Sequence, residues 1–359
     1  MEYLKGNQNG FFAVNKYSFY RACDLGMNAA VAYLVLSTGT DKSNTYTSWS
    51  VNAIENYTGI SRGRAQDAIK MLISNRLIKV VSEEKAKPRY EFIHADVVKK
   101  KAKKGAELPP DTEQTERLDP DKVVWLPNGI VQSVAGECPP LELIRQTQDV
   151  MVLRLFVDMY SEQNLVDDVG VKRYVYHHSY QKKELLQYAE YTVYGFSYET
   201  GHLTWGEITK PHRDNGENSG ANSFFKRVFL LRKLGLVIMT PYLFDSESAE
   251  GEPIHQLDEG IAASVQSAAF AMLLAVTGDE KRASTYIENY AYVVPIRSHF
   301  INVALIGVAE MRYKPRTKLT ATGYGEKQKR AREAKAAYEA LKERATPTQR
   351  ATRGFAKNL

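Results

Sequence analysis

The sequence predicts a mainly α-helical protein with small β-hairpins, in the α+β class. Two helices, a tight glycine turn, a third helix and a hairpin are expected between residues 28 and 93. A helix, the residues LGLV and an extended run repeat the end of this pattern between residues 219 and 244. Two more helices are expected at 260–277 and 279–292, and a basic tail begins at residue 312.

The central part of the first pattern is a pair of helices joined by a glycine. Ser50 is the expected N-cap of a short helix that ends near Tyr57, and Gly59 can take the positive φ that a tight turn requires. Ser61 is the expected cap of the next helix, whose apolar residues recur at spacings of three and four. These residues are Ala65, Ala68, Ile69 and Leu72. The polar residues between them are therefore expected off the core.

This helix pair is preceded by an expected helix and followed by an expected hairpin. Residues 28–37 are almost entirely apolar and predict the first helix. Two short apolar runs, 77–81 and 90–93, flank a charged segment and predict a β-hairpin with a basic tip. The basic residues of this hairpin include Lys85, Lys87 and Arg89.

Residues 28–93 resemble the winged helix-turn-helix domains of phage and plasmid replication initiators and of many bacterial regulators, over about a fifth of the chain. The resemblance implies that the second helix of the motif enters the major groove of double-stranded DNA. Arginine and glutamine suit bidentate contacts to guanine and adenine. The residues that would face the bases are Ser61, Arg62, Arg64, Gln66, Asp67 and Lys70. The alternatives are a merely solvated helix face, a protein-interaction module or a rigid connector.

Charge is distributed unevenly along the 359 residues. The chain has 48 Lys and Arg against 42 Asp and Glu, a net charge of +6. Counted by segment, residues 1–105 carry +8, residues 106–311 carry −12 and residues 312–359 carry +10. A polyanion such as DNA would therefore contact the two ends of the chain.

Composition and motifs point away from several classes of protein. Cys23 and Cys138 are far apart, so neither a disulfide framework nor a zinc site is expected, and a reducing cytoplasm is the simplest location. The run 261–276 is interrupted by polar residues and is expected to be too short for a membrane span. No phosphate-binding loop or hydrolase motif occurs. We expect no enzymatic activity, no metal and no cofactor.

A lysine-rich segment separates the first pattern from the rest. Residues 99–122 contain a lysine run and two prolines, and they predict a flexible linker. The first lysines of this run, Lys99, Lys100 and Lys101, are candidate phosphate contacts, although a solvated linker explains them equally well. The expected domains are 1–98, 123–245 and 246–311, with a tail at 312–359.

The segment 149–245 is expected to be a second, expanded winged helix. Its last helix, 219–234, would bury one apolar face against the core of the domain. That face would comprise Phe224, Phe225, Val228, Phe229, Leu231 and Leu234. Lys226, Arg227 and Arg232 would add a local basic patch for DNA. The alternative is a dimerisation or partner surface.

The basic tail is expected to act as a sequence-independent arm. Residues 326–344 are strong helix formers, but their apolar content is mostly alanine, so the helix would bury little by itself. We expect it to gain order on DNA, and the chain from Thr346 to be disordered. The alternative is a solvated tail that contacts nothing.

These expectations converge on a sequence-specific protein that binds double-stranded DNA and belongs to a phage, a plasmid or another mobile element. Tandem winged helices favour a replication initiator, and the lack of catalytic motifs favours a transcriptional regulator. Either would act as a dimer or multimer on DNA repeats. A protein-interaction or assembly factor, working through the acidic middle without reading DNA, is the alternative from a different class.

Overall fold

The computed structural model describes residues 10–82, 88–94, 122–132, 137–167, 169–203, 220–248 and 250–346. These residues form two compact units whose sequences interleave. Unit 1 comprises residues 1–162, 211–237 and 311–317, and unit 2 comprises 163–210, 238–310 and 318–359. The segment 123–245, expected as one domain, is divided between the units.

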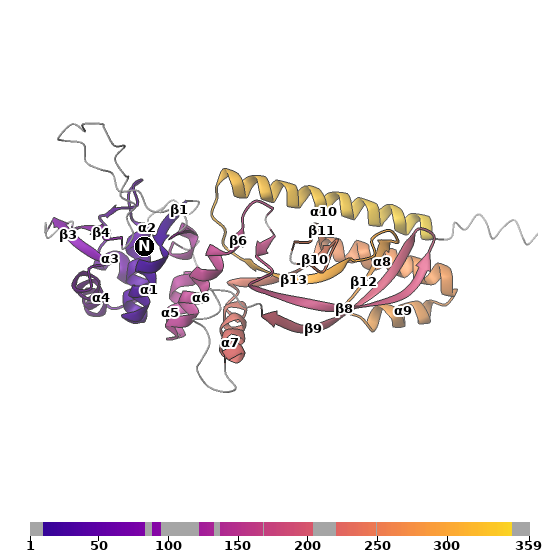
Figure 1. Cartoon of the computed structure of the whole chain (residues 1–359), viewed down its shortest axis with the longest axis horizontal. Helices are drawn as coiled ribbons and strands as arrows, with labels where there is room; N and C mark the ends of the chain where they lie inside the picture. The colour runs from indigo at the N-terminus through magenta and orange to yellow at the C-terminus, as the bar shows by residue number, and fades with distance from the viewer. Residues whose placement is uncertain are drawn as a thin grey trace, which may run out of the picture. The chain divides into compact units, whose positions relative to one another are not determined.

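Unit 1 begins with a set of short helices and strands (Figure 1). They are β1 (Phe11–Asn15), α1 (Lys16–Asp24), α2 (Met27–Thr38), β2 (Tyr46–Thr47), α3 (Val51–Thr58), α4 (Arg62–Ser74), β3 (Ile78–Ser82) and β4 (Arg89–Phe92). In the described residues, β2, β4 and β3 form an antiparallel sheet in that order. The three helices and the hairpin expected between residues 28 and 93 are therefore present, in the expected order along the chain.

Helix α2 forms the centre of this half of unit 1. Its residues from Ala29 to Ser37 are all buried, because α1, α3, α4 and α5 pack around it. A helix that is apolar on every side is stable in water only when neighbours cover it in this way. Tyr33 packs edge-on against Phe92 of β4, with ring centroids 5.2 Å apart, and so joins the helices to the sheet.

The remainder of unit 1 extends this core. Strand β5 (Val123–Pro127) pairs antiparallel with β1 and is followed by the short 3₁₀ helix η2 (Asn128–Ile130). Three further helices belong to this unit, namely α5 (Pro140–Gln146), α6 (Val150–Ser161) and α7 (Gly220–Lys233). Asp149 caps α6 by accepting a hydrogen bond from the backbone N–H of Met151 at 2.9 Å.

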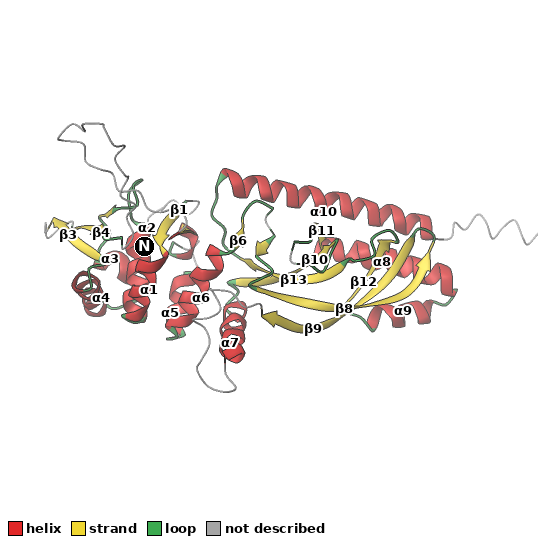
Figure 2. Cartoon of the chain, viewed as in Figure 1, coloured by secondary structure: helices red, strands yellow, loops and turns green. Residues whose placement is uncertain are grey.

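Unit 2 is built on a β-sheet with helices packed against it (Figure 2). In the described residues the strand order is β11-β10-β13-β8-β9-β12. The strands are β8 (Tyr176–Tyr188), β9 (Tyr191–Leu203), β10 (Val237–Phe244), β11 (Pro253–Gln256), β12 (Tyr292–Arg297) and β13 (Ala304–Met311), with the separate pair β6 (Gln163–Asn164) and β7 (Gly170–Val171). The helices are α8 (Glu259–Thr277), α9 (Glu280–Glu288) and α10 (Lys318–Ala345).

The expected fold class, mainly α with small β wings and tandem winged helices, is wrong. Residues 176–203 form one long hairpin, in which Tyr188 pairs with Tyr191 at the tip. This hairpin belongs to a large, curled antiparallel sheet of six strands in the described part of the chain. Strand β10, expected as the wing of a second winged helix, lies inside that sheet between β11 and β13.

Helix α10 also departs from the expectation of a weakly ordered arm. It packs against α8 and β11 and buries Tyr338, Leu341 and Ala345. These residues recur at spacings of three and four, so one face of the helix meets the core of unit 2. Residues 326–344 are therefore part of the folded unit without DNA. Disorder was expected from Thr346; the Thr346 hydroxyl donates to the Lys342 carbonyl at 2.8 Å, and the residues after it lie outside the described part of the chain.

Helix α8 is longer than the run 261–276, which was expected to be too short and too polar for a membrane span. By length and composition alone, Glu259–Thr277 could cross a membrane, a property that the core helix of a folded protein can share. In unit 2 its buried residues, which include Ile261, Val265 and Met272, pack with β12 and α10.

A buried histidine makes the stability of unit 2 depend on pH. Nδ1 of His255 donates a hydrogen bond to the Gln256 carbonyl at 2.9 Å, and Nε2 meets the Tyr338 hydroxyl at 3.1 Å. Burial is the largest influence on its pKa and lowers it, against smaller opposite effects of the Gln256 carbonyl and Asp258. The imidazole therefore stays neutral in the folded unit at pH values where an unfolded histidine gains a proton.

We expect unit 2 to lose stability as the pH falls below about 6.5, the pKa of an unfolded histidine. The unfolded chain then binds more protons than the folded one, so the free energy of unfolding decreases. Urea denaturation of the parent and of His255→Gln between neutral and acidic pH measures this effect. A slope against pH that is the same in both proteins would assign the dependence to other groups.

Candidate nucleic-acid interface

Helix α4 separates an apolar face from a polar one. Ala65, Ala68, Ile69 and Leu72 are buried at spacings of three and four, as expected from the sequence. The polar residues of the predicted site lie on the other side, and all are exposed. They are Ser61, Arg62, Arg64, Gln66, Asp67 and Lys70. The structure therefore brings six predicted residues together on one solvent-facing surface, which we call the α4 face.

Three of these side chains, Arg62, Asp67 and Lys70, have partners in the structure. The Arg62 guanidinium donates a hydrogen bond from Nη1 to Oδ1 of Asn52 on α3, at 2.7 Å. Lys70 forms an ion pair with Asp67 at 3.4 Å, and both side chains are more than two-thirds exposed. A solvated pair of this kind is weak, but it partly neutralises Lys70. Among the described residues, no carboxylate forms an ion pair with Arg62 or Arg64, the other two cations of the α4 face.

Helix α5 contacts the turn between α3 and α4. Gly59 has φ +63°, the left-handed conformation expected for the end of α3. Arg145 of α5 donates a hydrogen bond from Nε to the Thr58 carbonyl at 2.7 Å, which satisfies a carbonyl group at the C-terminus of α3. A Cβ at Gly59 would lie 3.2 Å from Oε1 of Glu142. The angle between α3 and α4 is therefore supported by a second part of unit 1.

The hairpin of β3 and β4 supplies one further described cation of the predicted site. The Arg89 guanidinium lies 4.6 Å from the ring centroid of Tyr46, so it stacks on the sheet while remaining exposed. Lys79 pairs with Glu91 across the hairpin at 2.9 Å. The other predicted cations of this region, Lys85, Lys87, Lys99, Lys100 and Lys101, lie outside the described residues.

Helix α7 holds the last predicted group of cations. Arg227 is largely buried and pairs through Nε with Oδ2 of Asp149 at 3.0 Å, so its charge anchors α7 to the start of α6. Lys226 and Arg232 are exposed. Phe229, expected in the core, is 65% exposed, whereas Phe224, Val228 and Leu231 are buried. The apolar face of α7 is therefore narrower than the sequence predicts.

Polar side chains also cluster elsewhere in the described residues, around two adjacent histidines of β8. No group of three or more His, Cys, Asp and Glu residues in the described part of the chain could hold a metal ion. His178 is buried on β8, and its ring nitrogens meet the hydroxyls of Tyr176 and Tyr198, the latter at 2.9 Å. His177 points its Nδ1 to the Arg173 carbonyl at 2.9 Å. The two adjacent histidines thus have separate partners and do not converge on one site.

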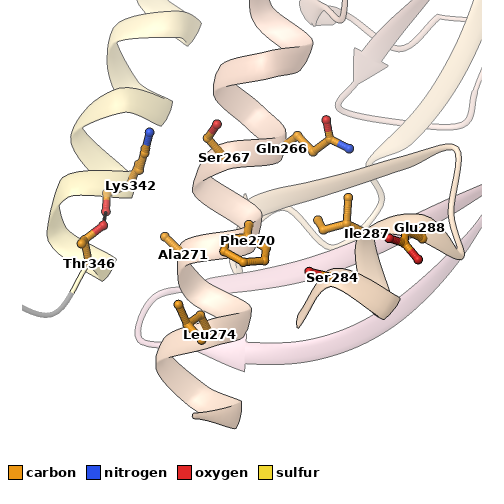
Figure 3. Close-up of a pocket in the computed structure, with 10 residues that line it drawn as sticks. All are labelled: Gln266, Ser267, Phe270, Ala271, Leu274, Ser284, Ile287, Glu288, Lys342 and Thr346. Atoms are coloured by element: carbon orange, nitrogen blue, oxygen red, sulfur yellow. Dashed lines mark hydrogen bonds between the residues drawn. The ribbon is translucent and has the colours of Figure 1, made fainter. Parts of the chain in front are cut away.

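Unit 2 also contains an apolar groove of about 510 Å³ between α8, α9 and α10 (Figure 3). Phe270 and Leu274 of α8 and Ile287 of α9 form most of its apolar wall, and Lys342 and Thr346 border it from α10. The hydroxyl of Thr346, the residue after the end of α10, donates to the Lys342 carbonyl at 2.8 Å. This lining has no paired acid and base of the kind that catalysis uses.

No family model matches this chain, and no curated protein and no solved structure matches it. The residues themselves therefore carry the functional argument.

Sequence reasoning missed three residues that shape the interface. Asn52 holds Arg62, Arg145 holds the turn between α3 and α4, and Asp149 neutralises Arg227. Asn52 lies near the start of α3, and its hydrogen bond to Arg62 depends on the angle between α3 and α4, which no helix periodicity sets. Arg145 and Asp149 are separated from their partners by 87 and 78 residues, so no local pattern identifies them.

Proposed function

We propose that residues 28–93 form a winged helix-turn-helix domain that binds double-stranded DNA in a sequence-specific manner. In this proposal α4 enters the major groove, and the hairpin of β3 and β4 contacts the backbone beside it. The observation that carries the proposal is the α4 face itself. Its polar residues are all exposed, while the opposite face of the same helix is fully used in the core.

The chemistry of the α4 face supports base readout. Arg62 and Arg64 offer guanidinium groups that can bond guanine at two atoms, and Gln66 can do the same with adenine. The hydrogen bond from Arg62 to Asn52 restricts the arginine before DNA arrives. A side chain that is already ordered loses less conformational entropy on binding. This preorganisation favours a role for Arg62 in specificity over one as a mobile phosphate contact.

We expect Arg62→Ala and Arg64→Ala each to weaken binding to the preferred DNA site by about 5- to 150-fold, equivalent to about 1–3 kcal/mol. Both side chains are exposed, so the thermal unfolding midpoint should not change. The preferred site is first selected from a pool of random duplexes, and affinities are then measured by fluorescence anisotropy.

Arg282→Ala provides the matched control, because it removes an exposed arginine from α9 of unit 2. This variant should bind the selected site as the parent does. If the pool yields no enriched sequence, or if both α4 variants bind as tightly as the parent, the α4 face does not read DNA.

The domain alone is compatible with both initiation of replication and regulation of transcription, and we propose that the protein serves a mobile element in one of these two ways. A footprint on DNA from the protein's own gene neighbourhood distinguishes them. Protection of direct repeats beside an AT-rich stretch favours initiation. Protection of a promoter favours regulation.

A further inference from the structure

Helix α7 presents an exposed aromatic ring among basic side chains. Phe229 is 65% exposed, and Lys226, Arg232 and Lys233 are exposed as well. The three cations lie three or four residues from Phe229, so all four side chains share one face of the helix. We call these four residues the α7 face.

The α7 face carries positive charge without compensation. The sequence of α7, GANSFFKRVFLLRK, contains no acidic residue. Its fourth cation, Arg227, points the other way and is paired with Asp149. In the described part of the chain the side chains of Lys226, Arg232 and Lys233 form no ion pair. Arg227 therefore has a structural role. The other three cations of α7 are available to bind an anion.

The exposed ring narrows the choice of anion. A single exposed aromatic ring is common on protein surfaces, but here three exposed cations surround it. The flat faces of nucleic-acid bases stack on aromatic rings, but they are accessible only where the strand is unpaired. Phosphates along such a strand complement the surrounding cations.

We propose that the α7 face binds single-stranded nucleic acid, with Phe229 stacking on an unpaired base and the three cations contacting phosphates. This surface shares no residue with the α4 face. Its function therefore does not depend on whether α4 reads duplex DNA.

The test uses the full-length protein and two fluorescent probes, a thymine oligonucleotide of about 20 nucleotides, long enough for the usual single-strand sites, and a random duplex of the same length. We expect Phe229→Ala to weaken binding to the single strand by about 5- to 150-fold, because stacking on one base contributes that much. Binding to the duplex should stay unchanged. Phe229→Trp should retain single-strand binding, since it keeps a stacking surface.

The cations are tested separately from the ring. Lys226→Gln with Arg232→Gln should weaken binding to the single strand and flatten its dependence on salt, because fewer counterions are released. Tyr324→Ala is the matched control for the ring. Tyr324 is an exposed aromatic residue on helix α10, and its neighbour Lys327 is paired with Glu310. This control should bind both probes as the parent does.

Three results would overturn the proposal. They are an unchanged single-strand affinity in Phe229→Ala, an equal loss on both probes, and equal competition by polyglutamate, which would indicate an acidic protein partner instead. Thermal unfolding of each variant shows whether it is folded. The Arg62→Ala variant separates the two proposals, because it should lose specific duplex binding while keeping the single-strand affinity.

Discussion

Glu310→Ala is expected to lower the free energy of unfolding of unit 2 by about 3–5 kcal/mol, the usual cost of removing one partner from a buried ion pair. Both oxygens of Glu310 accept from Nζ of Lys327, at 3.0 and 2.9 Å, and the two side chains are only 9% and 12% exposed. The Tyr242 hydroxyl also donates to Glu310 at 2.9 Å. Without the carboxylate, Lys327 stays buried with its charge unpaired. Urea denaturation followed by circular dichroism measures the loss.

A matched surface pair shows whether burial is the cause. Lys335 and Glu339 lie 3.9 Å apart on the same helix α10, with both side chains about half exposed. Lys335→Ala should change the free energy of unfolding by less than about 1 kcal/mol. Replacing both buried partners, as Glu310→Leu with Lys327→Met, should recover much of the stability. A loss in Glu310→Ala no larger than that in Lys335→Ala would mean that this pair does not hold α10.

The sequence predicted the first half of unit 1 because its signals are local. The spacing of Ala65, Ala68, Ile69 and Leu72 identifies the buried face of α4, and Gly59 identifies the turn before it. Each signal lies within one helix or at its end. For the same reason, the ends of the helix predicted at 28–37 each differ by one residue from those of α2, Met27–Thr38.

The six-stranded sheet was not predicted because some of its strand pairs are distant in sequence and its long hairpin has only a weak local signal. Ile306 pairs with Ser179, so β13 joins the sheet through residues more than a hundred positions away. The β8 sequence YHHSYQKKELLQY has no simple alternation of apolar and polar residues, and its pairing with β9 contains register shifts. A period-two pattern is the main local signal of a strand, and here it is weak.

In the candidate sites, too, local features were predictable from the sequence and contacts between helices were not. The exposure of Arg62 and Arg64 follows from helix periodicity, whereas the hydrogen bond from Arg62 to Asn52 follows from the angle between two helices. The apolar residues of α7 are spread around the helix and do not form a single stripe. Their spacing therefore does not predict that Phe224 is buried and Phe229 exposed. Packing against α6 decides between them.

Helix α10 offers the largest expected effect on stability. A chain ending at Thr317 lacks the buried side chains Tyr338, Leu341 and Ala345 and also Lys327, the partner of Glu310. Burial of one leucine contributes about 1.5–3 kcal/mol, and leaving Glu310 without its partner costs about 3–5 kcal/mol more. The sum reaches the range of about 5–15 kcal/mol in which whole domains are stable. We therefore expect unit 2 to lose its cooperative unfolding transition.

A chain ending at Thr346 is the control, because it keeps all of α10 and removes only the residues that follow it. Limited proteolysis and thermal unfolding of both chains measure the outcome. The shorter chain should be cleaved within residues 238–310, and the longer one should keep the transition of the parent. If the chain ending at Thr317 unfolds as cooperatively as the parent, α10 is a dispensable tail. The packing of α10 on α8 would then contribute little to the stability of unit 2.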